Sequence, residues 1–95
     1  MTDYRIFETD EFRRNVRELD ARQQSFVETK LSRYVYPQLR HQPYLGTNIK
    51  KLQGYQPETW RYRIGRFRVF YGIDEPNRIV NILTVDHRKD AYRGR

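Results

Sequence analysis

The sequence predicts an α+β domain: an antiparallel β-sheet of about four strands with an N-terminal two-helix hairpin packed on one face, in the order β-α-α-β-β-β. Two observations lead to this prediction. Apolar residues recur at helical spacing in the first half of the chain, whereas short segments of alternating apolar and polar residues fill the second half. The length of 95 residues suits one small domain, so residues 1–95 are expected to form a single domain.

The N-terminal part is expected to begin with a strand at residues 4–8, followed by a helix. Thr9 or Asp10 can cap this helix, because their side chains accept hydrogen bonds from the free backbone N–H groups of its first turn. Three apolar residues then recur at the spacing i, i+4, i+7 that places them on one helix face: Phe12, Val16 and Leu19.

A second helix is expected to follow directly. Asp20 and Gln23 have the spacing of a capping box, which marks the start of a helix. Four residues give this helix a buried face: Val27, Leu31, Tyr34 and Val35. Pro37 is expected to end it, since proline has no backbone N–H. The helical hairpin then spans residues 9–36, and residues 37–48 form a loop.

The second half is expected to form strands. They are predicted at residues 49–53, 60–64, 67–73 and 78–85, with residues 74–77 as the turn between the last two. Gly65-Arg66 has the composition of a two-residue type II′ turn. That turn fixes the register between its two strands, so that their aromatic and aliphatic residues lie on the side that the helices can cover.

The same register places three arginines on the other side of the sheet. Arg61, Arg63 and Arg68 share this side, with Arg63 directly opposite Arg68, and like charges at facing positions destabilise a hairpin. No acidic residue lies between Arg61 and Gly72 in the sequence. A site for an anion accounts for this arrangement. The alternative is a solvated face whose arginines pair with Asp or Glu from elsewhere in the fold.

Most of the excess positive charge also lies in the second half. The formal net charge is +7, yet residues 1–49 hold eight basic and seven acidic residues, whereas residues 50–95 hold eleven basic and five acidic. A phosphate-rich partner or an acidic protein is therefore expected. The end of the chain adds five side chains that are basic or able to transfer a proton: His87, Arg88, Lys89, Tyr92 and Arg93.

The composition excludes several functional classes. The chain has no Cys and only two His, so a disulfide, a thiolate nucleophile and a zinc site are not expected. The longest apolar stretch, residues 79–85, is too short to cross a membrane, and no signal peptide precedes it, so a cytoplasmic protein is expected. Serine hydrolases, NTPases and glycosidases are disfavoured, because the motifs or paired carboxylates that they need are missing.

Several Arg, a His and a Tyr suit phosphodiester cleavage without a metal or other cofactor. The arginines would bind the phosphate and offset the charge that builds up in the transition state. Surrounding guanidinium groups would favour the phenolate of Tyr92 and allow it to act as a general base. His87 would then protonate the departing oxygen. RNA suits this chemistry better than DNA, since its 2′-hydroxyl supplies an internal nucleophile.

Three segments of the chain resemble the RelE/ParE toxin superfamily: KKLQG at 50–54, WRYRIGRFRVFY at 60–71 and VDHRKDAYR at 85–93. With the two helices and the strand order, the resemblance covers essentially the whole chain. It implies a RelE-like toxin of a type II toxin–antitoxin module, a ribosome-dependent endoribonuclease that cleaves mRNA in the A site by attack of the 2′-hydroxyl on the phosphate. It also implies two partners besides mRNA: the ribosome, and an acidic antitoxin that wraps around the toxin.

The resemblance also implies a set of functional residues. The expected catalytic residues are Arg61, Arg63, Arg68, His87, Arg88 and Tyr92. The expected RNA-binding residues are Lys50, Lys51, Arg66, Lys89 and Arg93. The best-known member of the family has Lys at the positions of Arg61 and Arg63, so proton transfer from these two positions is not expected here.

Other functions remain open at this point. A ParE-like member shares the fold but inhibits DNA gyrase and lacks the basic and Tyr catalytic set. An inactive member would bind RNA without cleaving it, using the same basic and aromatic residues. DNA binding through Arg13, Arg14 and Arg17 of the first helix is less well supported, because acidic residues are interspersed among them.

Overall fold

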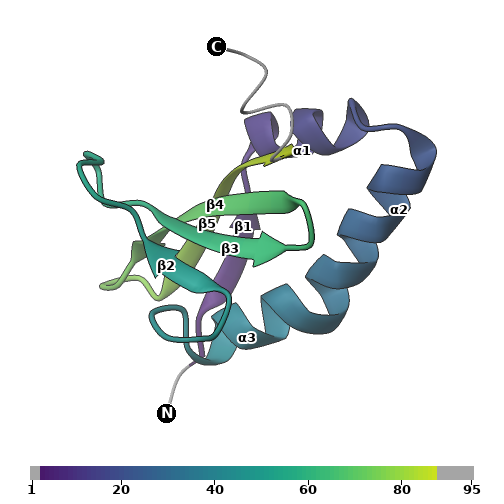
Figure 1. The fold of residues 1–95 in the computed structure, drawn as a ribbon. Coiled ribbons are helices and arrows are strands. Elements are labelled where there is room, and N and C mark those ends of the chain that lie inside the picture. The colour runs from purple at the N-terminus through teal and green to yellow at the C-terminus, as the bar shows by residue number, and fades with distance from the viewer. Residues whose placement is uncertain (1–2, 88–95) are drawn as a thin grey trace.

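The computed structural model describes residues 3–87 of the chain, as a helical layer beside a twisted β-sheet (Figure 1). The elements follow one another in the order β1 (Arg5–Glu8), α1 (Asp10–Arg17), α2 (Ala21–Lys30), the π-helix η1 (Leu31–Val35), α3 (Tyr36–His41), β2 (Ile49–Lys51), β3 (Trp60–Ile64), β4 (Phe67–Asp74) and β5 (Ile79–His87). The predicted α+β class is therefore confirmed.

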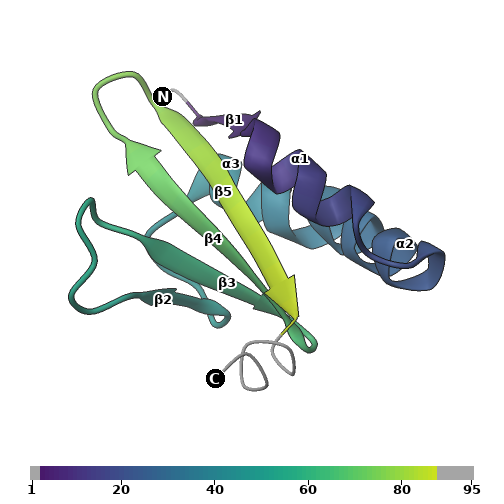
Figure 2. The same cartoon turned by 90° about the horizontal axis from the view of Figure 1, so that it is seen from above.

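The sheet has five strands in the order β1-β5-β4-β3-β2. All neighbours are antiparallel except β1 and β5, which run parallel. Each strand lies at a segment where a strand was predicted, but the sheet was expected to have about four strands and its parallel edge was not anticipated. Figure 2 shows that the helices lie on one side of the sheet. Among the described residues, the face of β2 to β5 on the other side carries no helix, and we call it the open face.

The core lies between the helices and the sheet. Each layer contributes fully buried side chains: Phe12 from α1, Val27 from α2, Val69 and Tyr71 from β4, and Val80 and Ile82 from β5. On β4 these buried residues alternate with half-buried ones, as expected for a strand with one covered face. Within residues 3–87, none of the helices has the length and apolar character that crossing a membrane requires.

Both predicted helix caps are present. Oγ1 of Thr9 accepts a hydrogen bond from the backbone N–H of Phe12 at 3.1 Å. Oδ1 of Asp20 accepts from the N–H of Gln23 at 2.8 Å, and Oε1 of Gln23 accepts in return from the N–H of Asp20 at 3.4 Å, which completes the capping box. The short polar residues before each apolar stripe therefore fix where α1 and α2 begin.

The prediction that Pro37 ends the second helix is wrong. The chain passes through the π turn of η1, where Tyr36 N–H donates to the carbonyl of Leu31, and then continues as α3 to His41. Pro37 lies in the first turn of α3, where a missing N–H is tolerated, and the wider turn before it changes the hydrogen-bond pattern that the ring would otherwise break. The loop therefore begins after His41, and Leu39 is fully buried.

The predicted β3–β4 hairpin is confirmed in every pair. Trp60 faces Tyr71, Tyr62 faces Val69 and Ile64 faces Phe67, while Arg63 lies opposite Arg68. Gly65 has a φ of +62°, as the first central residue of a type II′ turn requires. The turn chemistry and the alternation of the two strands thus determine the same register.

Gly65→Ala is expected to destabilise the protein by about 1–2 kcal/mol, because an L-residue is strained at this φ. The added Cβ would also lie 3.2 Å from Cζ of Phe26. Gly54→Ala is the matched control, since Gly54 has a φ of +77° but its Cβ would meet no atom within 4 Å. Urea unfolding should show a larger loss for Gly65→Ala than for Gly54→Ala; equal losses would mean that the Phe26 contact costs nothing.

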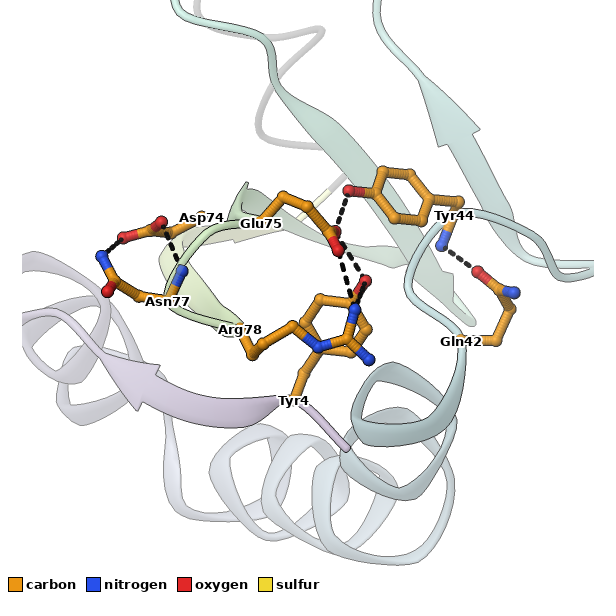
Figure 3. A network of polar contacts seen from close by, with 7 residues as sticks. All are labelled: Tyr4, Gln42, Tyr44, Asp74, Glu75, Asn77 and Arg78. Carbon is orange, nitrogen blue, oxygen red and sulfur yellow. Dashed lines mark hydrogen bonds and ion pairs between the residues drawn. The ribbon is translucent and has the colours of Figure 1, made fainter. Parts of the chain in front are cut away.

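A polar network joins the β4–β5 turn to the start of the chain and to the loop after α3 (Figure 3). The Glu75 carboxylate accepts hydrogen bonds from the hydroxyls of Tyr4 and Tyr44, both at 2.6 Å, and from Nη1 of Arg78 at 2.7 Å. The Arg78 guanidinium also lies 4.1 Å from the centroid of the Tyr4 ring. One carboxylate therefore holds three separate segments together at this end of the sheet.

The network predicts a pH dependence of stability. Hydrogen bonds from Tyr4, Tyr44 and Arg78 lower the pKa of Glu75 from 4.5 to about 2. A carboxyl whose pKa is lower in the folded state stabilises the fold above its unfolded pKa, and this contribution is lost as the pH falls from about 4.5 towards 2. Glu75→Gln should therefore be less stable than the wild type in urea at pH 7, with the difference shrinking at pH 3. A difference that is independent of pH would contradict this account.

Candidate nucleic-acid interface

The open face of the sheet gathers basic side chains from three strands. Lys50 lies opposite Arg61, and Arg61 lies opposite Phe70, which forms one row across β2, β3 and β4. Arg63 and Arg68 lie side by side in a second row across β3 and β4. We call the four cations of these rows the basic face: Lys50, Arg61, Arg63 and Arg68. The structure therefore brings together the three arginines that the hairpin register had placed on one side.

A carboxylate on β5 balances the charge of Arg68, which lies opposite Arg63. Its Nε and Nη2 donate to the two carboxylate oxygens of Asp86 on β5, at 3.1 and 2.9 Å. Its guanidinium also lies 5.3 Å from the centroid of the Phe70 ring. For Arg68, the alternative of pairing with a distant acidic residue is thus correct. A guanidinium has five N–H groups, so three of those of Arg68 still point away from Asp86 and are available to an anion.

The loop that leads into β2 holds the side chain of Arg61 and the backbone of Arg63. Nη1 of Arg61 donates to the backbone carbonyl of Asn48 at 3.1 Å, and the backbone N–H of Arg63 donates to the same carbonyl at 3.0 Å. The side chain of Arg61 is half-buried, whereas Arg63 is exposed. Both guanidinium groups add positive charge to the open face.

The remaining predicted residues do not all join the basic face. Lys51 alternates with Lys50 along β2, and its Nζ forms an ion pair with Glu58 at 2.7 Å. Arg66 is exposed at the tip of the β3–β4 hairpin. Four predicted residues lie outside the described part of the chain: Arg88, Lys89, Tyr92 and Arg93.

His87 is placed on the helix side of the sheet. It pairs with Phe67, and the two rings meet edge to face with centroids 4.8 Å apart. Phe67 is buried and belongs to the covered side of β4, so the imidazole is directed away from the basic face. The expectation that His87 lies beside the arginines is therefore not met.

A groove of about 400 Å³ lies on the open face next to Arg68. Its lining residues come from β4, β5 and the segment between β2 and β3: Leu52, Tyr55, Thr59, Arg68, Phe70, Leu83, Thr84 and Asp86. The sequence interpretation missed Tyr55, Phe70 and Asp86 as parts of a site. Alternation along β4 identifies Phe70, but Tyr55 lies in an irregular segment, where no periodic pattern marks it.

The interface offers positive charge and aromatic surface, the two features that bind single-stranded nucleic acid. Lysine and arginine side chains can bind phosphates, and the rings of Tyr55 and Phe70 can bind a base. Within residues 3–87, no three side chains of His, Asp or Glu lie close enough together to hold a metal ion.

Comparison with known proteins identifies relatives over the whole fold. The family model described as the ParE toxin of the type II toxin–antitoxin system parDE matches residues 5–92. No match was found among curated proteins. The toxin–antitoxin complex RelBE2 from Mycobacterium tuberculosis contains a similar chain, 28% identical with a TM-score of 0.71, and the match covers 90% of this chain and 99% of that one.

Two other solved structures share the fold at lower identity. In the archaeal RelE–RelB complex from Pyrococcus horikoshii the identity is 21% and the TM-score 0.67, over 93% of this chain and 97% of that one. In the intact RelBE complex of E. coli the corresponding values are 17% and 0.62, over 88% and 95%. With its sheet, helical layer and family match taken together, the chain is a type II toxin–antitoxin toxin of the ParE/RelE superfamily.

Proposed function

We propose that this toxin is a ribosome-dependent endoribonuclease, which cleaves mRNA in the ribosomal A site and so inhibits translation. The observation that carries the proposal is the basic face, where Arg61, Arg63 and Arg68 lie together beside a groove with aromatic walls. Phosphate contacts from arginine and stacking of bases on aromatic rings are the general means of binding single-stranded RNA.

The proposed reaction is attack of a ribose 2′-hydroxyl on the neighbouring phosphate, which breaks the bond to the 5′-oxygen of the next nucleotide. Arg61, Arg63 and Arg68 bind the phosphate oxygens and stabilise the negative charge that builds up on them. Asp86 positions Arg68, because its two hydrogen bonds fix the plane of the guanidinium.

The proton of the 2′-hydroxyl passes to Tyr92, which we assign as the general base, and Arg88 adds a further contact to the phosphate. The departing 5′-oxygen takes up a proton from solvent and not from His87, because the His87 ring contacts Phe67 on the helix side of the sheet. Lys50 and Arg66, with Lys89 and Arg93, extend the phosphate-binding surface away from the reacting bond.

The same charge suits a protein partner. The relatives from M. tuberculosis, P. horikoshii and E. coli were solved as toxin–antitoxin complexes. We infer that this toxin also binds an acidic antitoxin, which neutralises part of its net charge of +7. Its targets, mRNA and the ribosome, would then be met in the cytoplasm.

Inhibition of DNA gyrase is the second candidate, because the matching family model is that of the ParE toxin. Partial neutralisation of Arg68 by Asp86 also reduces the positive charge that the basic face offers to a phosphate. A third candidate, an inactive member that only binds RNA, would use the same basic face without cleavage.

Mapping of mRNA 5′ ends in a translating extract distinguishes these functions. The wild-type toxin should produce new ends in ribosome-bound mRNA and none when ribosomes are omitted, while Tyr92→Phe should produce none in either case. If the folded wild type yields no new ends but blocks supercoiling by gyrase, the ribonuclease proposal is wrong. If RNA is bound and neither activity is found, the inactive alternative is correct.

A further inference from the structure

We propose that the groove on the open face holds one unpaired RNA base, stacked on Tyr55, and that Asp86 selects bases with an exocyclic amine over uracil. This inference rests on the proposed function, because it takes RNA to be the partner of the basic face. It adds a base-binding site and a preference that phosphate contacts alone do not provide.

The groove has the size and lining of a base-binding site. Its volume of about 400 Å³ lies in the range of small-molecule pockets. Phe70 and Leu83 contribute apolar surface from β4 and β5, and Tyr55 lines the groove from the segment between β2 and β3. Tyr55 is 53% exposed, so much of its ring surface is accessible to a ligand.

A β-bulge shapes the floor of the groove. Phe70 pairs with Thr84 and Tyr71 pairs with Ile82, so Leu83 is an additional residue in β5. The bulge shifts the register of the following residues by one, which places Thr84 and Asp86 on the open face with Phe70 and Arg68. An apolar side chain and a carboxylate therefore line the same groove.

The charges orient the ligand in the groove. A phosphate is attracted by Arg61 and Lys50, which lie in the row across β2 and β3, and by the N–H groups of Arg68 that point away from Asp86, whereas the Asp86 carboxylate repels it. The uncharged base is the part of a nucleotide that fits beside Asp86. This arrangement puts the phosphate between the arginines of β3 and the edge of Arg68 that faces away from Asp86, and the base in the groove beside Asp86 over β4 and β5.

Asp86 gives the groove its preference for bases with an exocyclic amine. Its ionised carboxylate only accepts hydrogen bonds, and each of its two oxygens can accept a further one besides that from Arg68. Cytosine, adenine and guanine offer an exocyclic N–H₂ donor, whereas uracil presents a carbonyl oxygen at the position of the cytosine amine. The exocyclic amine of the first three bases can therefore donate to the carboxylate, whereas the N3–H donor of uracil lies between two carbonyl oxygens that the carboxylate repels.

Binding of 2′-O-methyl hexanucleotides to the isolated toxin, measured by fluorescence anisotropy, tests this inference. The blocked 2′-hydroxyl prevents cleavage by the proposed route, so the measurement does not depend on catalysis. Oligocytidine should bind about tenfold more tightly than oligouridine, the value of one hydrogen bond to a charged group. Asp86→Asn should remove most of this difference, because an amide both donates and accepts.

Tyr55→Ala should weaken oligocytidine binding about tenfold through the loss of stacking, whereas Tyr55→Phe should keep the wild-type affinity. Phe7→Ala is the matched control: Phe7 is 55% exposed but belongs to the edge strand β1 and does not line the groove, so its loss should not change the affinity. Thermal unfolding of each variant confirms that it is folded.

Equal affinities for oligocytidine and oligouridine in the wild type would overturn the selection by Asp86. Equal losses from Tyr55→Ala and Phe7→Ala would overturn the groove as the base site. Neither result bears on the proposed cleavage of mRNA on ribosomes, which the mapping of mRNA 5′ ends tests separately. Conversely, a toxin that discriminates between the two oligonucleotides but yields no mRNA ends would retain the base site and lose the proposed reaction.

Discussion

Arg68→Ala is expected to reduce the rate of mRNA cleavage on ribosomes by a factor of about 100 to 1000, the usual cost of losing one preorganised donor to a developing negative charge. Arg68 lies on the basic face, and two hydrogen bonds to Asp86 hold its guanidinium in place. Single-turnover cleavage of a short mRNA on programmed ribosomes measures the effect without contributions from product release.

Two further variants define what Arg68 contributes. Arg68→Lys keeps the charge but loses the planar fork, so its rate should fall between those of the wild type and Arg68→Ala. Arg22→Ala removes an exposed arginine from α2 and should cleave at the wild-type rate. If Arg68→Ala were folded and as fast as Arg22→Ala, Arg68 would have no part in the reaction.

Leu39→Ala is expected to lower the free energy of unfolding by about 2–5 kcal/mol, because Leu39 is fully buried and its loss leaves a cavity under α3. Leu45→Ala is the matched control in the loop that follows: Leu45 is 71% exposed, so its loss should cost less than about 0.5 kcal/mol. Urea unfolding measures both. Equal costs would indicate that residues 37–41 do not pack as a helix.

The contrast between these two leucines shows where sequence reasoning reached its limit in the helical layer. The starts of α1 and α2 were predictable, since Thr9 and Asp20 are polar capping residues next to an apolar stripe. The continuation past Pro37 was not, because it depends on the π turn of η1, whose hydrogen bonds no local pattern in the sequence identifies.

In the sheet, too, one part was predictable from the sequence and another part was not. The β3–β4 hairpin was predictable in every pair, because Gly65 and the alternation on both sides agree on one register. Pairing of β4 with β5 depends on the bulge opposite Phe70 and Tyr71. Counting from the β4–β5 turn without a bulge would place Arg68 opposite Val85, with Asp86 on the helix side.

The bulge therefore explains why Asp86 was not identified as part of the site and why His87 does not lie beside the arginines. A shift of one residue exchanges the faces of a strand, so it moves Asp86 beside Arg68 and moves His87 onto Phe67. The sequence of β5 contains no glycine that would mark a bulge. The three arginines of the basic face could be inferred from the sequence, but their carboxylate partner and the groove beside them required the three-dimensional structure.

The most direct test of the central claim, attack of an RNA 2′-hydroxyl at the basic face, is cleavage of an mRNA with a single 2′-deoxynucleotide on the 5′ side of the mapped cut. On programmed ribosomes the wild-type toxin should cut the unmodified mRNA and leave the substituted one intact at that position. Equal cleavage of both would contradict the proposed chemistry, and cleavage of neither would contradict the proposal that this toxin is a ribonuclease.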